Sequence, residues 1–600
     1  MIEQGEAQQR NTSRLSSIEL EQGYVLACQT AVSGDLQVFI PPQEAIVRQL
    51  PSERAAVAVP ALAVRCDWQT NPIVHKFFLT LEPPSLSDNT TDLERLRREL
   101  AKQHGVRDLV AGLPVLRRLA HTLRESSTDK GWQVTAVVEM GTWVDEDAPP
   151  RLVDLLPGDH TAQTLVAAVD VGTTSNVVYL ADLASGKFID SASAYNAQIS
   201  CGEDVISRIL YAKKEGGLEH LQRLVVQTIN ELLHELAERN HVPAGEIYAM
   251  TVAGNTTMLH LLLALDPMYI RLEPYIPTMN HLLPVQAREL GIHICPEATV
   301  DCLPCVGAYV GGDITAGVLS SGMFQTDKLT LFIDVGTNGE IVLGNSDWLI
   351  SCACSAGPAF EGAGVRSGMR ATVGAIEEVW IHADTYEPTY RVIGEAAPRG
   401  ICGSGMISLL AEMFITGVVD KSGRLNRSLN TSRVRAGEHG AEYVVAWAQE
   451  TQGQKEDIVL TEVDISNLIR AKGAIYAGFS VLTTSVGVDL ADVEELLIAG
   501  AFGKYIDIEK AIQIGLLPDM PWERFRYLGN TSALGAFTAL LCRDMRRQVT
   551  EIANKMTYLE LSADNQFMEQ FTSALFLPHT DTTAFPSVMR LLNNRRRGES

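Results

Sequence analysis

The sequence predicts a multidomain α/β protein, and three observations carry this prediction. The chain has 600 residues, which is more than one hydrophobic core organises, so several domains are expected. Apolar residues make up 46% of the chain and charged residues 20%, which is typical of a globular protein. From residue 162 onward, strand-like and helix-like segments alternate for most of the remaining length. This alternation is typical of α/β domains.

Composition also excludes several classes of partner. The formal net charge is −24, whereas nucleic acids and anionic membranes are bound by basic surfaces. We find no signal peptide and no apolar run of membrane-spanning length, because stretches such as "MLHLLLAL" (258–265) are short enough for a core. Ten scattered cysteines do not form a secreted disulfide framework. We therefore expect a cytoplasmic protein with reduced thiols.

Four segments follow one another along the chain. Residues 1–43 end in "DLQVFIPP", a strand-like run that two prolines stop, and residues 44–75 resemble a linker in composition. In residues 76–161, "HKFFLTLEPP" and "WQVTAVVEM" are strand-like, and an amphipathic helix pattern lies between them. This segment is predicted to be a small α/β middle domain. Residues 162–600 are predicted to be one large domain with a C-terminal tail.

One helix of the large domain is predicted clearly, over residues 218–239. Its apolar residues recur every three or four positions, which places them in a single buried stripe. These residues are Leu218, Leu221, Val225, Ile229, Leu232 and Leu236.

Two segments of the large domain repeat each other. "LVAAVDVGTTSNVVYLAD" (165–182) and "LTLFIDVGTNGEIVLGN" (329–345) each read as a strand, the tetrapeptide Asp-Val-Gly-Thr and a second strand. Glycine at such a turn permits a tight hairpin with the backbone close to a ligand, and exposed N–H groups there cradle phosphate oxygens. The predicted phosphate-binding residues are Gly172, Thr173, Thr174, Gly336, Thr337, Asn338 and Gly339.

An aspartate precedes each of these turns. Asp170 and Asp334 are candidate catalytic residues and Mg²⁺ ligands, because Mg²⁺ keeps several waters and is held by a few carboxylates together with phosphate. The alternative is that each side chain only caps its own turn. One such motif is weak evidence, whereas two copies in the same strand–turn–strand context favour nucleotide binding.

A third element strengthens the nucleotide prediction. In "LLIAGAFGKY" (496–505) a buried strand meets a glycine-rich turn, where Gly500, Ala501 and Gly503 let the backbone approach the flat ring of an adenosine. Together the three elements resemble the acetate and sugar kinase/Hsp70/actin superfamily. The resemblance implies two lobes of related topology, ATP in the cleft between them, and closure of the lobes on ATP.

Six longer stretches narrow this resemblance. They are "YNAQISCGEDVISRILYA" (195–212), "VAGNTTMLHLLLALDP" (252–267), "VGGDITAG" (310–317), "SAGPAFEGAGVRSGMRATVGAI" (355–376), "GICGSGMISLLAEMFITGVVD" (400–420) and "YLELSADNQFMEQFTSALFLPH" (558–579). Together they resemble the reductive activators of corrinoid proteins. The resemblance extends from about residue 15 to 585 and implies a [2Fe–2S] ferredoxin domain of β-grasp fold, a linker, a small middle domain and a large two-lobed actin-like ATPase domain.

The activity that the resemblance implies is ATP-dependent reduction of a corrinoid cofactor in anaerobic metabolism. The cofactor is carried by a partner, either a corrinoid protein or a corrinoid-dependent methyltransferase, and its inactive Co(II) state is returned to Co(I). An electron donor such as a ferredoxin is a further partner. Because this reduction is uphill, ATP must favour one of two states of the complex over the other.

Five further residues are candidates for the site. Glu340 could point into the cleft and orient water, or it could be an ordinary strand residue. Asp313 could position water or Mg²⁺, or it could only cap a helix. Gly403 and Gly405 could lie beside the nucleotide, or they could only begin a helix. The resemblance places Ser355 on the face that meets the corrinoid protein, and the alternative is a loop serine bonded to its own backbone.

Other residues that bear metal-binding side chains are assigned to structure. Cys302 and Cys305 have the spacing of a zinc or redox motif, but structural zinc needs four ligands. The other close pair, Cys352 and Cys354, has the wrong spacing. All four are predicted to be buried thiols. His260 is predicted to be a core histidine, because it lies in a helix with core spacing.

Cys28, in "GYVLACQT", matches the last cluster ligand of a plant-type ferredoxin, yet it is the first cysteine of the chain. One thiolate cannot hold a [2Fe–2S] cluster, which needs four. Three explanations are open: a misplaced start codon, loss of the cluster with electrons supplied by a separate ferredoxin, or a degraded gene. We favour the first, because half a ferredoxin exposes an unpaired sheet edge.

Two other function classes stay open at this point. A small-metabolite kinase of the same fold would turn over ATP with a small acceptor and no corrinoid protein. An ATP-switched chaperone or scaffold would bind the corrinoid protein without forming Co(I). A homodimer with a two-fold axis is the default expectation for the oligomeric state.

Overall fold

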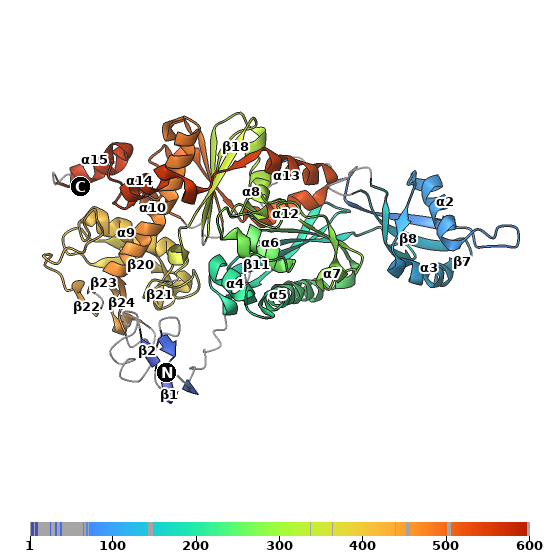
Figure 1. Cartoon of the computed structure of the whole chain (residues 1–600), viewed down its shortest axis with the longest axis horizontal. Coiled ribbons are helices and arrows are strands. Elements are labelled where there is room, and N and C mark those ends of the chain that lie inside the picture. The colour runs from blue at the N-terminus through green and yellow to red at the C-terminus, as the bar shows by residue number, and fades with distance from the viewer. Residues whose placement is uncertain are drawn as a thin grey trace. The chain divides into compact units, whose positions relative to one another are not determined.

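A computed structural model (Figure 1) describes residues 71–596, apart from 142–147, Thr337, Ala363, His439, 452–455 and 501–505. Before residue 71 it describes four short strands, which are β1 (Ile2–Gln4), β2 (Ala7–Gln9), β3 (Thr30–Val32) and β4 (Gln37–Val38), and the single positions 25, 64, 66, 68 and 69. β1 pairs with β4 and β2 with β3, both antiparallel. Cys28 lies outside the described residues, so the predicted ferredoxin-like segment stays a prediction.

By its internal contacts the chain divides into two units. One contains Met1–Gln49 and Gly362–Arg470, and the other contains Leu50–Glu361 and Ala471–Ser600. The larger unit carries both repeated segments. Among the described residues, no helix has the length and apolar character needed to cross a membrane.

The larger unit begins with a small mixed sheet, in which β6 is parallel to β9 and the other pairs are antiparallel, and two helices cover it. Alternate residues of its strands are buried together with Leu96, Leu100 and Leu119 of the helices, which form one apolar core. The first helix has Thr91 as its N-cap and ends at Gly105, which has a φ of 73°. The elements are β5 (Val74–Leu81), α2 (Asp92–His104), β6 (Val110–Ala111), α3 (Leu113–Glu125), β7 (Ser127–Thr128), β8 (Gly131–Glu139) and β9 (Arg151–Pro157).

The first repeated segment forms the centre of a six-stranded sheet. Its order is β12-β11-β10-β13-β15-β14, with β10 antiparallel to β11 and parallel to β13. The strands are β10 (Leu165–Val171), β11 (Ser175–Asp182), β12 (Lys187–Tyr195), β13 (Ile247–Gly254), β14 (Val285–Gln286) and β15 (Thr299–Cys302). The helices of this half are α4 (Val205–Ala212), α5 (Gly217–Arg239), α6 (Thr256–Leu262), α7 (Ala287–Leu290) and α8 (Gly312–Ser321).

The predicted helix over 218–239 corresponds to α5. Five of the six predicted stripe residues are buried and Leu218 is partly buried. The apolar spacing therefore identified the buried face of this helix correctly.

The second repeated segment forms the centre of another six-stranded sheet, in the order β26-β25-β16-β17-β18-β27. Here β16 is antiparallel to β17 and parallel to β25, as β10 is to β11 and β13. The duplication in the sequence is thus a duplication of topology. The strands are β16 (Thr330–Val335), β17 (Gly339–Gly344), β18 (Leu349–Cys354), β25 (Glu495–Ala499), β26 (Phe525–Gly529) and β27 (Met556–Tyr558).

In each half three parallel strands lie side by side, β10, β13 and β15 in the first and β16, β25 and β26 in the second, and equivalent helices follow the third of them. α8 follows β15, and α12 (Thr531–Leu541) follows β26. The two helices pack against each other so closely that a Cβ atom on Gly535 would overlap the carbonyl of Ala316. α12 also packs on β10 and β13 of the first sheet. The remaining helices of this unit are α11 (Ile508–Gln513), α13 (Arg543–Lys555), α14 (Asn565–Ala574) and α15 (Pro586–Arg596).

The smaller unit contains two three-stranded sheets and a buried helix. Their orders are β20-β19-β21 and β22-β23-β24. The elements are β19 (Ala375–Ile381), β20 (Pro388–Val392), β21 (Gly400–Ile401), α9 (Gly403–Thr416), β22 (Val434–Gly437), β23 (Gly440–Ala446) and β24 (Ile458–Thr461), and α10 (Glu462–Ser485) continues into the larger unit.

Candidate functional site

The two hairpin turns place acidic side chains at equivalent strand ends. Asp170 lies one residue before the end of β10, and Asp334 lies one residue before the end of β16. In the second hairpin, Asp334 is directly opposite Glu340 of β17. Directly opposed residues of an antiparallel pair share one face of the sheet. The hairpin itself therefore brings Asp334 and Glu340 together.

Two side chains at the start of α12 hold Asp170. The hydroxyl of Ser532 donates to its Oδ1 at 2.7 Å, and the amide of Asn530 donates to its Oδ2 at 2.9 Å. Burial raises the pKa of Asp170, and these two hydrogen bonds oppose the rise. Asp170 thus connects the first hairpin to a helix of the second half.

Burial and neighbouring carboxylates raise the pKa of the other three carboxyl groups. Burial and, next, the charge of Asp170 raise the pKa of Asp334 to about 7. Burial and the charges of Asp334 and Asp170 raise the pKa of Asp313 to about 8. The pKa of Glu340 is raised well above its usual range by burial and by Asp313 and Asp334. The structure therefore gathers Asp170, Asp313, Asp334 and Glu340 into one electrostatically coupled group.

Such a group of carboxylates suits a hydrated divalent cation. The described residues contain no group of three or more histidine, cysteine or acidic side chains placed to bind a metal ion directly. Mg²⁺ characteristically keeps several of its waters, so carboxylates can hold it through hydrogen bonds to these waters. A cation there would also relieve the mutual repulsion that raises these pKa values.

The turn of the first hairpin is braced from three sides. The amide of Asn196 donates to the carbonyl of Gly172 at 2.9 Å. The guanidinium of Arg208, which is fully buried, donates to the carbonyl of Thr173. The amide of Asn255 donates to Oγ1 of Thr173 at 3.0 Å. The turn is therefore fixed before any ligand binds.

A hydrogen bond also links the two halves at this turn. Oγ1 of Thr174 donates to Oε2 of Glu361 at 3.0 Å, and Glu361 ends the short helical turn Pro358–Glu361 that follows β18. The phosphate-binding turn predicted in the first half thus contacts the segment after the last hairpin strand of the second half.

Fewer neighbouring atoms surround the glycine of the second hairpin turn than the glycine of the first. The N–H of Gly336 donates to the carbonyl of Asn338 at 2.9 Å, and a Cβ atom on Gly336 would have no neighbour nearer than 3.9 Å. Gly500 has a φ of 93°, and a Cβ atom there would lie 2.7 Å from Oδ1 of Asp334. Glycine at 500 is thus required both by its backbone and by the carboxylate next to it. Thr337, Ala501 and Gly503 lie outside the described residues.

Sequence reasoning missed the residues that brace the site. Asn255 and Asn530 are the N-caps of α6 and α12, accepting hydrogen bonds from the N–H groups of Met258 and Ala533. Each also donates from its amide to the first hairpin. The signal was a second repeat, because "GNTT" (254–257) and "GNTS" (529–532) are nearly identical. Arg208 and Asn196 lie in the stretch 195–212 that carries the family resemblance, but no repeat marks them.

The remaining predicted residues belong to other elements of the chain. Gly403 and Gly405 belong to the smaller unit, where they begin α9, and a Cβ atom on Gly405 would overlap the carbonyl of Ile376. Ser355 is exposed directly after β18. Cys302 and Cys305 are buried, and burial raises the pKa of each thiol to about 12, as expected of structural cysteines.

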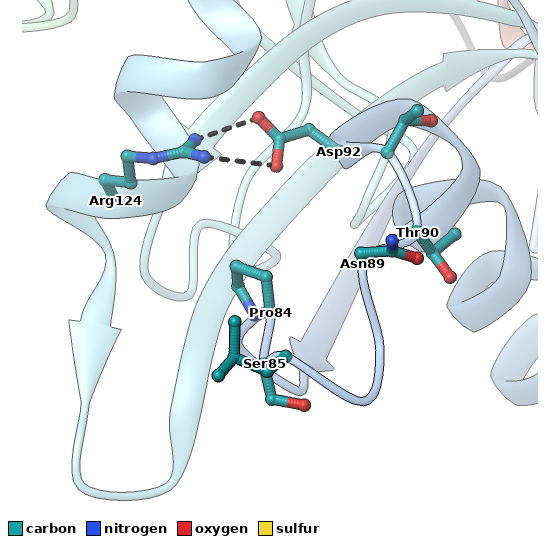
Figure 2. A pocket seen from close by; sticks show the side chains of 8 residues that line it. Pro84, Ser85, Asn89, Thr90, Asp92 and Arg124 are labelled. Atoms are coloured by element: carbon teal, nitrogen blue, oxygen red, sulfur yellow. Dashed lines mark hydrogen bonds and ion pairs between the residues drawn. The ribbon is translucent and has the colours of Figure 1, made fainter.

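A surface pocket that the sequence did not predict lies beside α2 (Figure 2). Pro84, Ser85 and Asn89 line it, and Arg124 of α3 donates to Oδ2 of Asp92 at 2.9 Å at its edge. None of the sequence-predicted site residues lines this pocket.

The [2Fe–2S] cluster that the resemblance implies does not fit the cysteines present. Within residues 1–65 the chain supplies Cys28 and no other cysteine, whereas the cluster needs four ligands. No redox step is therefore assigned to a cluster in this chain.

Comparison with known families covers almost the whole of the described chain. Residues 64–162 match the RACo linker region, residues 165–326 match the RACo middle region, and residues 328–589 match the C-terminal domain of RACo, the ASKHA domain. The boundaries predicted from the sequence, at 44–75, 76–161 and 162–600, stay predictions.

Named relatives agree with these matches. The chain is 33% identical to the corrinoid activation enzyme RamQ of Eubacterium limosum over 559 residues, which are 91% of this chain and 88% of that protein. It is 29% identical over 274 residues, 42% of this chain and 46% of the relative, to the [Co(II) methylated amine-specific corrinoid protein] reductase of Methanosarcina barkeri.

A solved structure described as the reductive activator for corrinoid, iron-sulfur protein is 43% identical in sequence. Its TM-score is 0.77, and the match covers 98% of this chain and 92% of that one. The duplicated sheets, the hairpin turns and these similarities lead to one conclusion: the chain belongs to the RACo family of reductive activators of corrinoid proteins, with an ASKHA domain as its C-terminal region.

Proposed function

We propose that this chain uses ATP to drive the reduction of a partner's corrinoid cofactor from inactive Co(II) to Co(I). The observation that supports this most is the coupled group of Asp170, Asp313, Asp334 and Glu340 at two duplicated hairpins, in a chain of this family. The partner is a corrinoid protein or a corrinoid-dependent methyltransferase. The site of action is the cytoplasm.

The hairpin turns bind the phosphates of ATP. Glycine at positions 172 and 336 lets the backbone of each turn approach a phosphate, because neither residue carries a side chain that would block it. Thr173 and Thr174 add hydroxyl groups, which Asn255 and Glu361 already orient.

The carboxylates hold Mg²⁺ and water. Asp334 and Asp313 bind the hydrated cation, which would neutralise phosphate charge when it is present. Glu340 lies opposite Asp334, and its raised pKa makes it a stronger base than a surface glutamate. It orients the water that attacks the terminal phosphate and accepts its proton. Asp170 positions the first hairpin through Asn530 and Ser532.

Electrons come from a donor such as a ferredoxin. ATP favours the state of the complex in which the cobalt accepts this electron, which requires different affinities for the two states. Ser355, exposed after β18, is the candidate side chain for contact with the corrinoid partner. A two-fold homodimer is the expected assembly.

The test is anaerobic reduction of a purified corrinoid protein, followed by the visible absorption of Co(I). The full chain with Mg-ATP and a low-potential electron donor is expected to form Co(I), and the same mixture with ADP is not. ATP hydrolysis that the partner stimulates, without any Co(I), would refute the proposal in favour of a scaffold. ATP turnover with a small acceptor alone would indicate a kinase.

A further inference from the structure

The segment where the chain enters its described core is fixed against the start of α13. Val64 and Ile73 are buried in the same apolar core as Val549 of that helix. The backbone N–H of Arg543 donates to the carbonyl of Asn71 at 3.1 Å. The hydrogen bond holds Asn71 at the first turn of α13, far along the sequence.

A second anchor lies on the other side of this segment. The indole ring of Trp68 packs over Gly186, where a Cβ atom would overlap it. The N–H of Met140 donates to the carbonyl of Ile73 at 3.0 Å. Position 66, between these anchors, therefore has a defined place on the core.

Two thiols meet at that place. Sγ of Cys66 is 2.6 Å from Sγ of Cys542, although 476 positions separate them in the sequence. The sulfurs are thus in closer contact than two thiols that only pack together, and a disulfide bond of about 2.05 Å needs only a small further approach. Cys542 is fully buried, whereas Cys66 is half-buried. Small reagents therefore reach the pair from the side of Cys66.

The surroundings of Cys542 favour its thiolate form. It is the N-cap residue of the 13-residue helix α13, where backbone N–H groups and the helix dipole stabilise negative charge. The pKa of Cys542 is lowered, chiefly because the thiol of Cys66 donates to it and then through the N–H of Met545, while burial opposes the shift. Cys66 is thus the accessible thiol and Cys542 the stronger nucleophile beside it.

We propose that Cys66 and Cys542 are a redox-active pair that closes to a reversible disulfide, bonding residues 64–73 covalently to the start of α13. The oxidant is a low-molecular-weight disulfide. The bond attaches the chain at Cys66 covalently to the start of α13. Oxidation therefore constrains the attachment point of the N-terminal segment and does not alter the carboxylate group of the nucleotide site.

The chemistry balances as two thiol–disulfide exchanges. The thiolate of Cys66 attacks one sulfur of the small disulfide, forms a mixed disulfide and releases one small thiol. The thiolate of Cys542 then attacks the sulfur of Cys66, forms the Cys66–Cys542 bond and releases the second small thiol. Two protein thiols are oxidised and one small disulfide is reduced, and the two protons lost by the protein are carried by the two released thiols.

The test uses the full chain, anaerobically reduced and then incubated with glutathione disulfide. Remaining thiols are alkylated, and the protein is digested with trypsin without a reducing agent. Cleavage after Arg65 and Arg526 gives two peptides, 66–76 and 527–543, and each contains a single cysteine. We expect a joined peptide with the mass of both less two hydrogens, and a fall of at least about fivefold in each parent peptide.

A non-reducing denaturing gel gives an independent readout. The bond would close a loop of 476 positions, so the oxidised chain should migrate faster and return to its original position with dithiothreitol. Cys66→Ser should abolish the faster band. Cys201→Ser is the matched control, because Cys201 is also half-buried, and it should leave the band unchanged.

Two outcomes would overturn the proposal. One is unchanged 66–76 and 527–543 peptides under conditions that modify Cys201. The other is a joined peptide that forms only after the protein is denatured. Because the digest reads the wild-type chain, neither result depends on whether a cysteine variant folds.

Discussion

The two hairpins of the duplicated core differ in what surrounds their aspartates. Asp170 in the first accepts hydrogen bonds from Asn530 and Ser532, whereas Asp334 in the second lies opposite Glu340 and has its pKa raised to about 7. The two hairpins are equivalent in topology, but neutral hydrogen-bond donors surround Asp170, whereas other carboxylates surround Asp334.

The difference arises at one position of two equivalent helices. Ser532 is the second residue of α12, and Asp313 is the second residue of α8. Ser532 donates to Asp170, while Asp313 raises the pKa of Glu340 through its charge. The duplication therefore produced two hairpins with different roles. The first connects the two halves through hydrogen bonds, and the second carries the carboxylates that a cation would stabilise.

Replacing the two aspartates tests this division and should give the largest effects. Asp334→Asn is expected to lower Mg²⁺-dependent ATP hydrolysis at least about 100-fold, because it removes charge where the cation and phosphates are stabilised. Its thermal unfolding should change little, since the amide relieves repulsion. Asp170→Asn should instead destabilise the protein by about 1–3 kcal/mol, because an amide cannot accept from both Asn530 and Ser532 without turning its NH₂ group toward a donor.

Steady-state hydrolysis and thermal melts of both variants check this prediction. Asp347→Asn is the matched control, because Asp347 is exposed between β17 and β18 of the same half, and neither measurement should change. Equal losses of stability in Asp334→Asn and Asp170→Asn would show that the two hairpins do not differ in task.

The hairpins were predictable from the sequence, and their surroundings largely were not. A β-branched strand followed by Asp-Val-Gly-Thr determines its own local structure, so Asp170 and Asp334 were found with their turns. Glu340 was a candidate with an open alternative, and the register of the hairpin places it opposite Asp334. Ser532, in contrast, reaches Asp170 only because α12 packs on β10. A contact between residues 362 positions apart has no local signature.

The asparagine caps lie between these extremes. Asn255 and Asn530 each precede an apolar helix, which is a local signal for an N-cap, and their repeated "GNT" context was visible. The sequence did not predict that both amides donate to the first hairpin, because these contacts depend on how the helices pack on the sheets. The family's motifs supplied the activity, which neither periodicity nor composition could give.

Replacing these caps sharpens the comparison, with a smaller expected effect. Asn255→Ala and Asn530→Ala each remove an N-cap, which costs about 0.5–2 kcal/mol. Asn530→Ala should cost about 1 kcal/mol more, because it also removes a donor to the carboxylate of Asp170. Asn530→Asp keeps a capping oxygen but sets a second carboxylate against Asp170, so it should be the least stable of the three. Urea unfolding midpoints rank them, and an Asn530→Asp variant as stable as wild type would mean that Asp170 is not anchored by this residue.

A pH dependence of stability should come mainly from the second hairpin, because two hydrogen bonds oppose the rise in the pKa of Asp170. An aspartate in an unfolded chain has a pKa of about 3.9, whereas the folded pKa is about 7 for Asp334 and about 8 for Asp313. Between these values the folded protein keeps protons that the unfolded chain has lost. The free energy of unfolding without metal should therefore fall as pH rises from about 4 to about 8, and level off above that.

Mg²⁺ should reverse this trend, because it binds the carboxylates that become ionised as the pH rises. Melting temperatures measured with EDTA and with Mg²⁺ from pH 6 to 8.5 should diverge as pH rises, and the divergence should shrink in Asp334→Asn and Asp313→Asn. Asp170→Asn should retain most of it, since hydrogen bonds from Asn530 and Ser532 oppose the rise in the pKa of Asp170. A Mg²⁺ shift that is the same at pH 6 and pH 8.5 would place the cation away from the second hairpin, and one that disappears in Asp170→Asn alone would transfer the cation-binding task to the first.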